Sequence, residues 1–180
     1  MVILGLGSNF GNRMDYLSKA VNKLSKSVLA AVEMSNIYES TAILKNGSPD
    51  SWNQKFLNMA IRGETHLSPS ELLKQIKMIE KELGRLDRGV WAPREIDIDI
   101  LAYDNIYINN DELTIPHKHL YTRPFALVPL AELAPNWQCP MDGAFKGKTA
   151  YEITDQLISS CNEELIKTDN RITISDILVA

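Results

Sequence analysis

The chain has 180 residues, of which 44% are hydrophobic and 23% charged, and its formal net charge is −4. This length and composition predict one folded domain with a sizeable core, and they exclude disordered, collagen-like and membrane-spanning classes. The acidic balance weighs against a nucleic-acid-binding protein, because such proteins gain much of their affinity from a basic surface.

The first part of the chain predicts a regular alternation of strands and helices. Apolar spacing places the elements, in chain order, as a strand at residues 1–7, a helix from Met14 to Val28, strands at 32–40 and 56–65, a helix from Ser68 to Gly84 and a strand at 96–100. Loops at 41–53 and 85–95 interrupt them. This βαββαβ order is typical of the ferredoxin-like fold, an α+β class in which helices pack on one face of an antiparallel sheet.

Local signals support these boundaries. Asn12 or Asp15 is the expected N-cap of the first helix. Ser68, Pro69 and Glu71 form a capping box with proline in the first turn, which marks the start of the second helix. The first strand begins without the charged segment of a signal peptide, so we expect a cytoplasmic protein.

The sequence beyond the last strand of this alternation predicts shorter elements. Residues 106–108 are predicted to pair with the strand at 96–100 across a turn at 103–105. Pro124 opens a short helix that Pro135 closes.

The C-terminal part has weaker signals. A helix is predicted near residues 150–158 and a strand near 171–175. We therefore expect residues 1–140 to carry the main activity and residues 141–180 to form a C-terminal extension of the same domain, with no role that the sequence assigns.

Asp97 and Asp99 carry the strongest chemical signal. Residues two apart on a strand point to the same face, with Cα atoms about 6.5–7 Å apart. Ile96, Ile98 and Ile100 then face the core while both carboxylates face outward. Mg²⁺ prefers carboxylate oxygens together with substrate phosphates, and such metals neutralise charge on a transferring phosphoryl group. The alternative is a half-exposed strand with an ordinary polar face.

The loop before this strand is basic. Arg85, Arg88 and Arg94 lie close together there with Trp91 among them. Guanidinium groups bind phosphate oxygens in a forked geometry and keep their charge, and an indole stacks on flat rings. The loop therefore favours a clamp for a nucleotide phosphate, with a solvated charged loop as the alternative.

Histidine and cysteine give weaker signals. His117 and His119 form a His-x-His pair, but a third ligand at metal-binding spacing is missing, so a single histidine that donates to a phosphate is the favoured interpretation. Cys139 and Cys161 are expected to be reduced structural thiols.

Short motifs in a fixed order then point to a family. They are Leu6-Gly7-Ser8-Asn9, Phe56-Leu57-Asn58, residues 79–85, residues 91–99, Ile115-Pro116-His117, Arg123-Pro124-Phe125 and Val128-Pro129-Leu130. Over about residues 3–140 they resemble the 6-hydroxymethyl-7,8-dihydropterin pyrophosphokinase family of folate biosynthesis. The resemblance implies transfer of the β,γ-pyrophosphoryl group of ATP to the pterin hydroxymethyl oxygen with release of AMP, by a ferredoxin-like domain at residues 1–140.

The resemblance also implies roles for individual residues. The implied catalytic residues are Arg85, Arg94, Asp97 and Asp99, of which the two aspartates hold two Mg²⁺ ions. The implied nucleotide-binding residues are Lys77, Glu80, Arg85, Trp91, Arg94, Ile100, Thr114, His117 and Arg123. The implied pterin-binding residues are Gly7, Ser40, Ile43, Phe56, Asn58, Asp97 and Phe125. No residue is marked as a general base.

Some positions depart from the family pattern. Lys77 stands where glutamine is frequent, Ala92 where glycine is common, and Lys118 where proline or tyrosine is usual. These changes bear on affinity and loop rigidity more than on activity. From composition and the resemblance together, we expect the loops at 41–53 and 84–95 to order over bound ATP and pterin.

Two alternatives remain at this point. One is a different Mg²⁺-dependent nucleotidyl or phosphoryl transferase on the same fold, and the other is a ferredoxin-like RNA-binding module. The expected partners are the small molecules ATP and 6-hydroxymethyl-7,8-dihydropterin, without nucleic acid or membrane. A neighbouring folate-pathway enzyme in a longer natural chain is a further expectation.

Overall fold

The computed structural model describes residues 1–161 and 164–173. The strands of its main sheet are β1 (Val2–Ser8), β2 (Ala30–Met34), β3 (Tyr38–Ser40), β4 (Phe56–Glu64), β5 (Asp97–Tyr103) and β8 (Leu165–Lys167). Within the described residues this sheet has six strands in the order β5-β1-β4-β3-β8, with β2 also paired to β4, and its strand pairs are antiparallel. An antiparallel sheet with packed helices was predicted and is confirmed, and the strand order is consistent with the ferredoxin-like arrangement.

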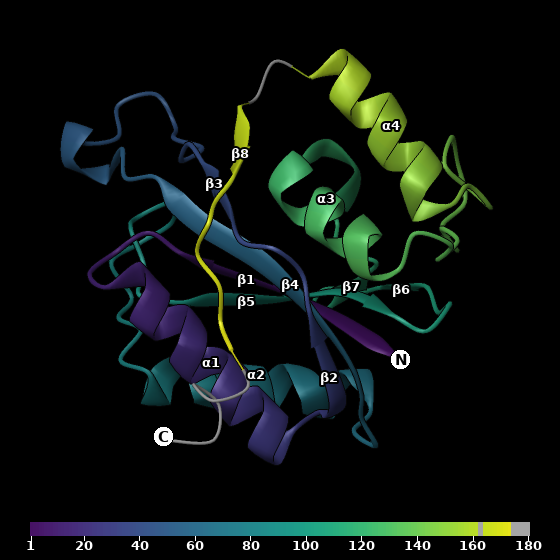
Figure 1. Ribbon diagram of the computed structural model, residues 1–180, viewed down its shortest axis with the longest axis horizontal. Helices are drawn as coiled ribbons and strands as arrows, with labels where there is room; N and C mark the ends of the chain where they lie inside the picture. Colours follow the sequence, from purple (N-terminus) through teal and green to yellow (C-terminus); the bar gives the residue numbers. More distant parts are fainter. Residues whose placement is uncertain (162–163, 174–180) are drawn as a thin grey trace.

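Helices cover both faces of the sheet. They are α1 (Arg13–Ser27), α2 (Pro69–Glu82), α3 (Pro124–Leu133) and α4 (Ala150–Ser160), accompanied by single 3-10 turns at Asp50–Trp52 and Leu120–Thr122. Figure 1 shows α1 and α2 on one side of the strands and α3 and α4 on the other. The sequence predicted helices on one face only, so the second helical layer is a finding of the structure.

The predicted helix starts are confirmed. The Asn12 side chain accepts a hydrogen bond from the Asp15 N–H at 3.2 Å and caps α1. Ser68 and Glu71 form both bonds of a capping box at the start of α2, and Pro124 begins α3. These bonds satisfy N–H groups that the first helical turn otherwise leaves unpaired.

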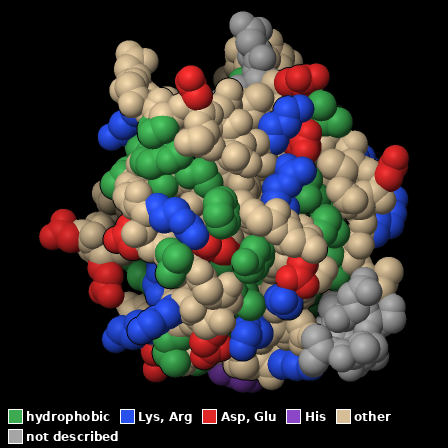
Figure 2. Space-filling model, turned by 90° about the vertical axis from the view of Figure 1, so that its left-hand side faces the viewer, with side chains coloured by type: hydrophobic (Ala, Val, Ile, Leu, Met, Phe, Trp, Pro, Cys, Tyr) green, Lys and Arg blue, Asp and Glu red, His purple; other side chains and the backbone are tan. Residues whose placement is uncertain are grey.

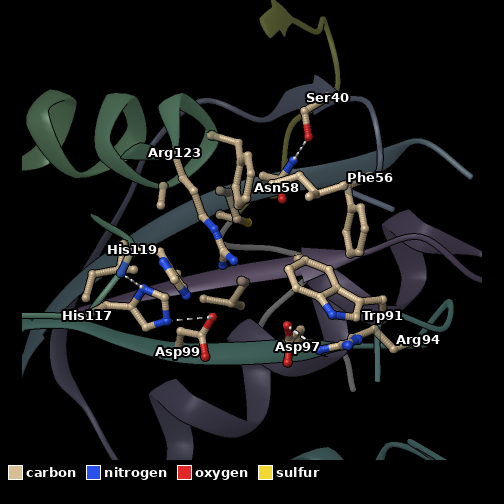
Figure 3. Close-up of a pocket in the computed structure, with 18 of the residues that line it drawn as sticks. Ser40, Phe56, Asn58, Trp91, Arg94, Asp97, Asp99, His117, His119 and Arg123 are labelled. Atoms are coloured by element: carbon tan, nitrogen blue, oxygen red, sulfur yellow. Dashed lines mark hydrogen bonds and ion pairs between the residues drawn. The ribbon is translucent and has the colours of Figure 1, made fainter. Parts of the chain in front are cut away.

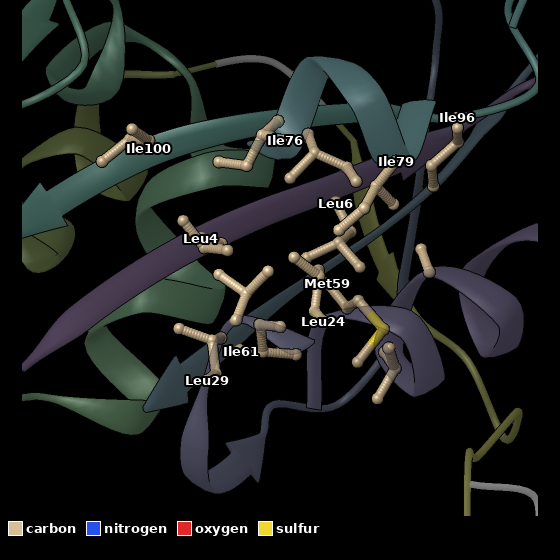
Figure 4. Packing of buried hydrophobic residues seen from close by; sticks show 14 of the residues in the cluster. Leu4, Leu6, Leu24, Leu29, Met59, Ile61, Ile76, Ile79, Ile96 and Ile100 are labelled. Carbon is tan, nitrogen blue, oxygen red and sulfur yellow. The ribbon is translucent and has the colours of Figure 1, made fainter. Parts of the chain in front are cut away.

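The main core lies between the sheet and the helices α1 and α2. Figure 4 shows Leu4 and Leu6 of β1 and Ile61 of β4 packed against Leu24 of α1 and Ile76 of α2, and these five side chains are 0–2% exposed. Full burial of one such side chain is worth roughly 1.5–3 kcal/mol. Because successive side chains of a strand point to opposite faces, the other residues of each strand face away from α1 and α2. On that side of the sheet, α3 and α4 leave part of the surface uncovered.

The single strand predicted at 32–40 is wrong. The chain bends at residues 35–37, and β2 and β3 pair separately with β4. The cause is Ser35, whose hydroxyl oxygen accepts the Ala60 N–H at 2.9 Å while its own N–H donates to the Ala60 carbonyl at 3.0 Å. The Ser35 hydroxyl thus takes the place of a main-chain carbonyl as the acceptor of the Ala60 N–H, and the strand is interrupted there.

The pairing predicted between 106–108 and 96–100 is also wrong. A turn follows β5 as predicted, but β6 (Ile108–Asn109) pairs with β7 (Thr114–Ile115). Asp104 turns the chain away with φ 44°. Beside the free edge of β5, the His117 N–H donates to the Leu101 carbonyl at 3.0 Å and takes one of the available acceptors.

The C-terminal predictions are partly confirmed. The helix predicted near 150–158 is α4, and a strand that the sequence did not indicate, β8, pairs with β3. Residues 171–173 of the strand predicted at 171–175 are irregular, and 174–175 lie outside the described residues. Among the residues that the structure describes, none of the helices has the length and apolarity needed to cross a bilayer. Figure 2 shows basic, acidic and hydrophobic side chains mixed over one face.

Candidate active site

The floor of the site is a pair of glycines in the central strand. Gly7 lies opposite Asp97 of β5 and Asn58 of β4, and Gly5 lies opposite Asp99. Because neither glycine carries a side chain, the sheet surface between the aspartates and the asparagine is open. A pocket of about 390 Å³ lies over this floor, on the face away from α1 and α2.

Asp97 lies between two arginines at one end of the pocket. Arg85 donates to its Oδ1 at 2.7 Å. Arg94 donates to its Oδ2 at 2.8 Å (Figure 3). Burial by itself favours the neutral acid, but the positive charges of Arg94 and Arg85 outweigh it and hold the pKa of Asp97 below its usual value. Asp97 is therefore an ionised carboxylate, and the predicted meeting of arginines and aspartates is present.

Asp99 lies in a different environment on the same strand. Burial at the pocket floor and the charge of Asp97 raise the pKa of Asp99, although its side chain is still 41% exposed toward the open pocket. His117 Nε2 is 3.9 Å from Asp99 Oδ2, too far for a hydrogen bond. The two aspartates therefore share one face and repel each other.

His117 is oriented by its own chain. Its Nδ1 accepts the His119 N–H at 3.3 Å, which leaves the ring proton on Nε2, the atom that faces Asp99. Burial and the charge of Arg123 lower the pKa of His117 to about 4. The ring is therefore neutral at physiological pH and presents an N–H donor to the pocket.

The carboxylate pair fits a magnesium site of a particular kind. Among residues 1–161 and 164–173, three or more histidine, cysteine, aspartate or glutamate side chains do not gather into a cage for a metal ion. Mg²⁺ in phosphoryl-transfer sites uses one or two carboxylates and takes its remaining ligands from substrate phosphates and water. Asp97 and Asp99 match that donor set, and a divalent cation at this pair would offset the repulsion between them.

Glu80 lies beside β5 and does not line the main pocket. It is 3% exposed, and its Oε1 accepts the Ile98 N–H at 2.8 Å and a bond from Arg85. Its Oε2 accepts from Lys77 at 2.8 Å. Glu80 thus binds the β5 backbone at Ile98, the residue between the two aspartates. It also binds Arg85, which contacts Asp97. Its bonds in the structure are to protein groups, and its role at the nucleotide stays a prediction.

The other end of the pocket is neutral and partly aromatic. Asn58 is 5% exposed, and its Nδ2 donates to the Ser40 hydroxyl at 2.9 Å. Phe56, Phe125 and Ile43 line the same pocket. In Figure 3, Phe56 and Asn58 lie on the side away from His117. This end therefore suits a flat, uncharged ring with hydrogen-bonding edges.

The loop before β5 reaches over the pocket. Trp91 lies in it with φ 71°, and the cations of Lys45 and Arg123 are 5.9 and 6.0 Å from its ring. Arg88 does not take the predicted position at the phosphate clamp, because it pairs with the buried Glu95 instead. The loop thus delivers Trp91 and two of its three arginines toward the site.

Most of the predicted site residues meet in one place. Of the predicted set, three residues do not line the main pocket: Glu80, Ile100 and Thr114. The Ile100 side chain packs in the core on the opposite face, and Thr114 lies in β7. The sequence missed Gly5 and His119 as lining residues, because only the strand register and the turn after His117 bring them there.

Comparison with known proteins gives a consistent result. Residues 3–135 match the model of the 7,8-dihydro-6-hydroxymethylpterin-pyrophosphokinase family. The chain is 46% identical over 135 residues to the 2-amino-4-hydroxy-6-hydroxymethyldihydropteridine pyrophosphokinase of Aquifex aeolicus, covering 75% of this chain and 81% of that protein. It is 43% identical over 155 residues to the folate synthesis bifunctional protein of Chlamydia muridarum, covering 84% of this chain.

The similarity to the bifunctional proteins covers only part of their length. The chain spans about a third (34%) of the length of the Chlamydia bifunctional protein. In three dimensions it resembles the crystal structure of Plasmodium falciparum HPPK-DHPS with a TM-score of 0.64 and 16% identity, over 88% of this chain and 44% of that one. At this identity the likeness shows a shared fold.

Proposed function

Because the chain belongs to the 7,8-dihydro-6-hydroxymethylpterin-pyrophosphokinase family, we propose that it transfers the β,γ-pyrophosphoryl group of ATP to the hydroxymethyl oxygen of 6-hydroxymethyl-7,8-dihydropterin. The products are AMP and the pterin diphosphate, in folate biosynthesis. One observation carries the proposal: Asp97 and Asp99 share the floor of a pocket that has arginines beside Asp97 and an aromatic, neutral end at Asn58.

The neutral end takes the pterin. Asn58 offers a side-chain amide, which both donates and accepts, to the polar edge of the ring. Phe56 and Phe125 offer flat apolar surface, and stacking adds roughly 0.5–1.5 kcal/mol beyond burial. Ser40 fixes the Asn58 amide through its hydroxyl, so the orientation that recognises the pterin is set before it binds.

The charged end takes the triphosphate. Asp97 and Asp99 hold the two Mg²⁺ ions, which when bound neutralise charge on the transferring group. Arg85 and Arg94, which donate to Asp97 in the structure, then have phosphate oxygens as alternative acceptors for their forked N–H groups. The Nε2–H group of the neutral His117 ring donates a hydrogen bond to a phosphate oxygen.

The remaining nucleotide contacts come from the rim of the pocket. Lys77, Trp91 and Arg123 line it, and Lys77 donates a hydrogen bond to Glu80. Attack by a hydroxyl on phosphorus needs little covalent help from a protein, since alignment and charge cancellation supply most of the rate. The chain's own contribution is therefore to place the pterin oxygen in line with the bound triphosphate.

Gly7→Val is expected to block the pterin end selectively. A Cβ at Gly7 would lie 3.2 Å from Asn58 Oδ1 and 3.4 Å from Phe56 Cδ1, and the two further methyl groups of valine fill the same space. We expect the KM for the pterin to rise by roughly tenfold or more. Calorimetric titration with Mg²⁺ and a non-hydrolysable ATP analogue is expected to give an unchanged affinity, and Gly7→Ala a smaller pterin effect. Normal pterin affinity in a folded Gly7→Val protein would contradict this placement.

A product assay tests the proposed function. Purified protein is incubated with ATP, with and without the pterin, in Mg²⁺ or in excess EDTA, and AMP is resolved from ADP. AMP that requires both the pterin and Mg²⁺ supports the proposal. ADP formation would favour the alternative phosphoryl transferase, and salt-sensitive RNA binding without ATP turnover would favour the RNA-binding alternative.

We also propose that residues 141–180 belong to the same domain as residues 1–140. Ala150 and Ile153 of α4 are buried in one apolar cluster with Leu127 and Leu130 of α3, which supports a single shared domain. The Chlamydia and Arabidopsis relatives are named as bifunctional folate synthesis proteins, which supports a further folate-pathway enzyme as a partner. A cytoplasmic location stays a prediction.

A further inference from the structure

We propose that Asn9 is a positioning residue that joins the two loops flanking the pocket and fixes the backbone of Arg94. This inference rests on the proposed function. Asn9 directly follows β1 and is 2% exposed. Its Oδ1 accepts the Arg94 N–H at 2.9 Å, and its Nδ2 donates to the Gln54 carbonyl at 3.1 Å. Its own N–H donates to the Arg94 carbonyl at 3.2 Å.

These bonds place one buried side chain between two loops that meet beside the pocket. Arg94 ends the basic loop, and its guanidinium contacts Asp97. Gln54 precedes Phe56, the first residue of β4 and part of the pterin wall, by two positions. A shift of the Arg94 main chain relative to Gln54 would therefore change the spacing between the phosphate end and the pterin end.

The amide of Asn9 is suited to this task by its chemistry. The contact with Arg94 needs an acceptor and the contact with Gln54 needs a donor, and a side-chain amide supplies both without charge. Aspartate keeps the acceptor and loses the donor, and alanine loses both. Comparison of asparagine, alanine and aspartate at position 9 therefore separates the contact with Arg94 from the contact with Gln54. The aspartate side chain has nearly the same shape as that of asparagine.

The experiment compares Asn9→Ala and Asn9→Asp with wild type and with Asn105→Ala, a change of an exposed asparagine in the turn after β5 that does not line the pocket. For each protein, kcat, the KM of the pterin and the affinity for Mg²⁺ with a non-hydrolysable ATP analogue are measured. Hydrogen exchange is followed in the peptides that contain Arg94 and Gln54. Asn9→Asp keeps the test informative if Asn9→Ala does not fold.

We expect Asn9→Ala to lower kcat by roughly 10- to 100-fold, because small misplacements of catalytic groups have effects of this size. Affinity for the analogue stays within about threefold, since the phosphate-binding side chains remain. Exchange rises in both peptides in Asn9→Ala and only in the Gln54 peptide in Asn9→Asp, while Asn105→Ala matches wild type.

Other outcomes overturn the inference. It fails if Asn9→Ala keeps kcat within about twofold of Asn105→Ala, or if exchange of the Arg94 peptide is unchanged. Equal exchange of the Arg94 peptide in Asn9→Asp and Asn9→Ala also contradicts it, because the retained acceptor would then have no effect. If wild type forms no AMP, the proposed function fails, whereas the exchange pattern still decides whether Asn9 joins the loops.

Discussion

Asp97→Asn and Asp99→Asn are each expected to lower pyrophosphoryl transfer by roughly 100- to 1,000-fold, with the fold retained. Both carboxylates face the pocket, and either change removes a negative oxygen from the pair proposed to hold Mg²⁺ with the triphosphate. Loss of one group that stabilises transition-state charge commonly costs 100- to 1,000-fold in kcat. The measurement is the rate of pterin-dependent AMP formation.

The two variants are expected to differ in stability. Asp97 is the acceptor for both Arg85 and Arg94, so Asp97→Asn weakens two charge-assisted bonds and lowers the free energy of unfolding. Asp99 has a raised pKa beside Asp97, so Asp99→Asn removes a repulsion and leaves stability unchanged or slightly higher. Urea unfolding in EDTA measures both.

An exposed aspartate gives the matched control for this pair. Asp111→Asn changes a residue in the turn between β6 and β7, which does not line the pocket. Its activity and its free energy of unfolding are expected to match wild type. Near-normal AMP formation by Asp97→Asn and Asp99→Asn, alongside a normal Asp111→Asn, would refute the metal assignment.

Arg94→Ala is expected to lower kcat by roughly 100- to 1,000-fold while the pterin KM changes little. Arg94 Nη1 lies 2.8 Å from Asp97 Oδ2, beside the proposed phosphate site, and loss of one donor that stabilises transition-state charge commonly costs roughly 100- to 1,000-fold in kcat. Arg94→Lys is expected to recover only part of the loss, because an ammonium group is a point charge without the forked geometry.

Arg88→Ala, in the same loop, separates catalysis from loop structure. Arg88 pairs with Glu95, which is 4% exposed, so its loss leaves a buried carboxylate without that partner and lowers the melting temperature. Arg94→Ala is expected to do the reverse, with a large fall in kcat and a small change in melting temperature. Equal effects of the two variants on kcat would show that Arg94 acts only through loop structure.

Local sequence patterns were sufficient to predict the elements that position the carboxylates. Alternation along residues 96–100 assigned Asp97 and Asp99 to the face opposite the core, and the structure confirms that they share a face. The caps at Asn12 and Ser68 were equally readable, since each involves residues three apart in the chain. Such features depend on contacts between near neighbours, which a sequence displays directly.

Features that depend on distant contacts were not predictable in this way. The alignment of Gly7 with Asp97 and Asn58 follows from the register of three strands, and no local pattern specifies that register. The second helical layer depends on apolar contacts between α3, α4 and the sheet. The break at Ser35 depends on a side chain that replaces a ladder partner.

The roles of individual site residues came mainly from the family resemblance. It grouped Glu80 with the nucleotide-binding residues, and the structure adds that this side chain lies beside β5, where it accepts the Ile98 N–H. The register and burial of each residue are thus needed to separate groups that contact a ligand from groups that hold those contacts in place.

The most direct measurement follows each phosphate of ATP to its product. Protein, Mg²⁺, the pterin and ATP labelled separately at the α-, β- or γ-phosphate are incubated, and the products are separated. The proposed function predicts that the β and γ labels both enter the pterin product while the α label stays in AMP. Transfer of the γ label alone, with ADP formed, would contradict pyrophosphoryl transfer at this site.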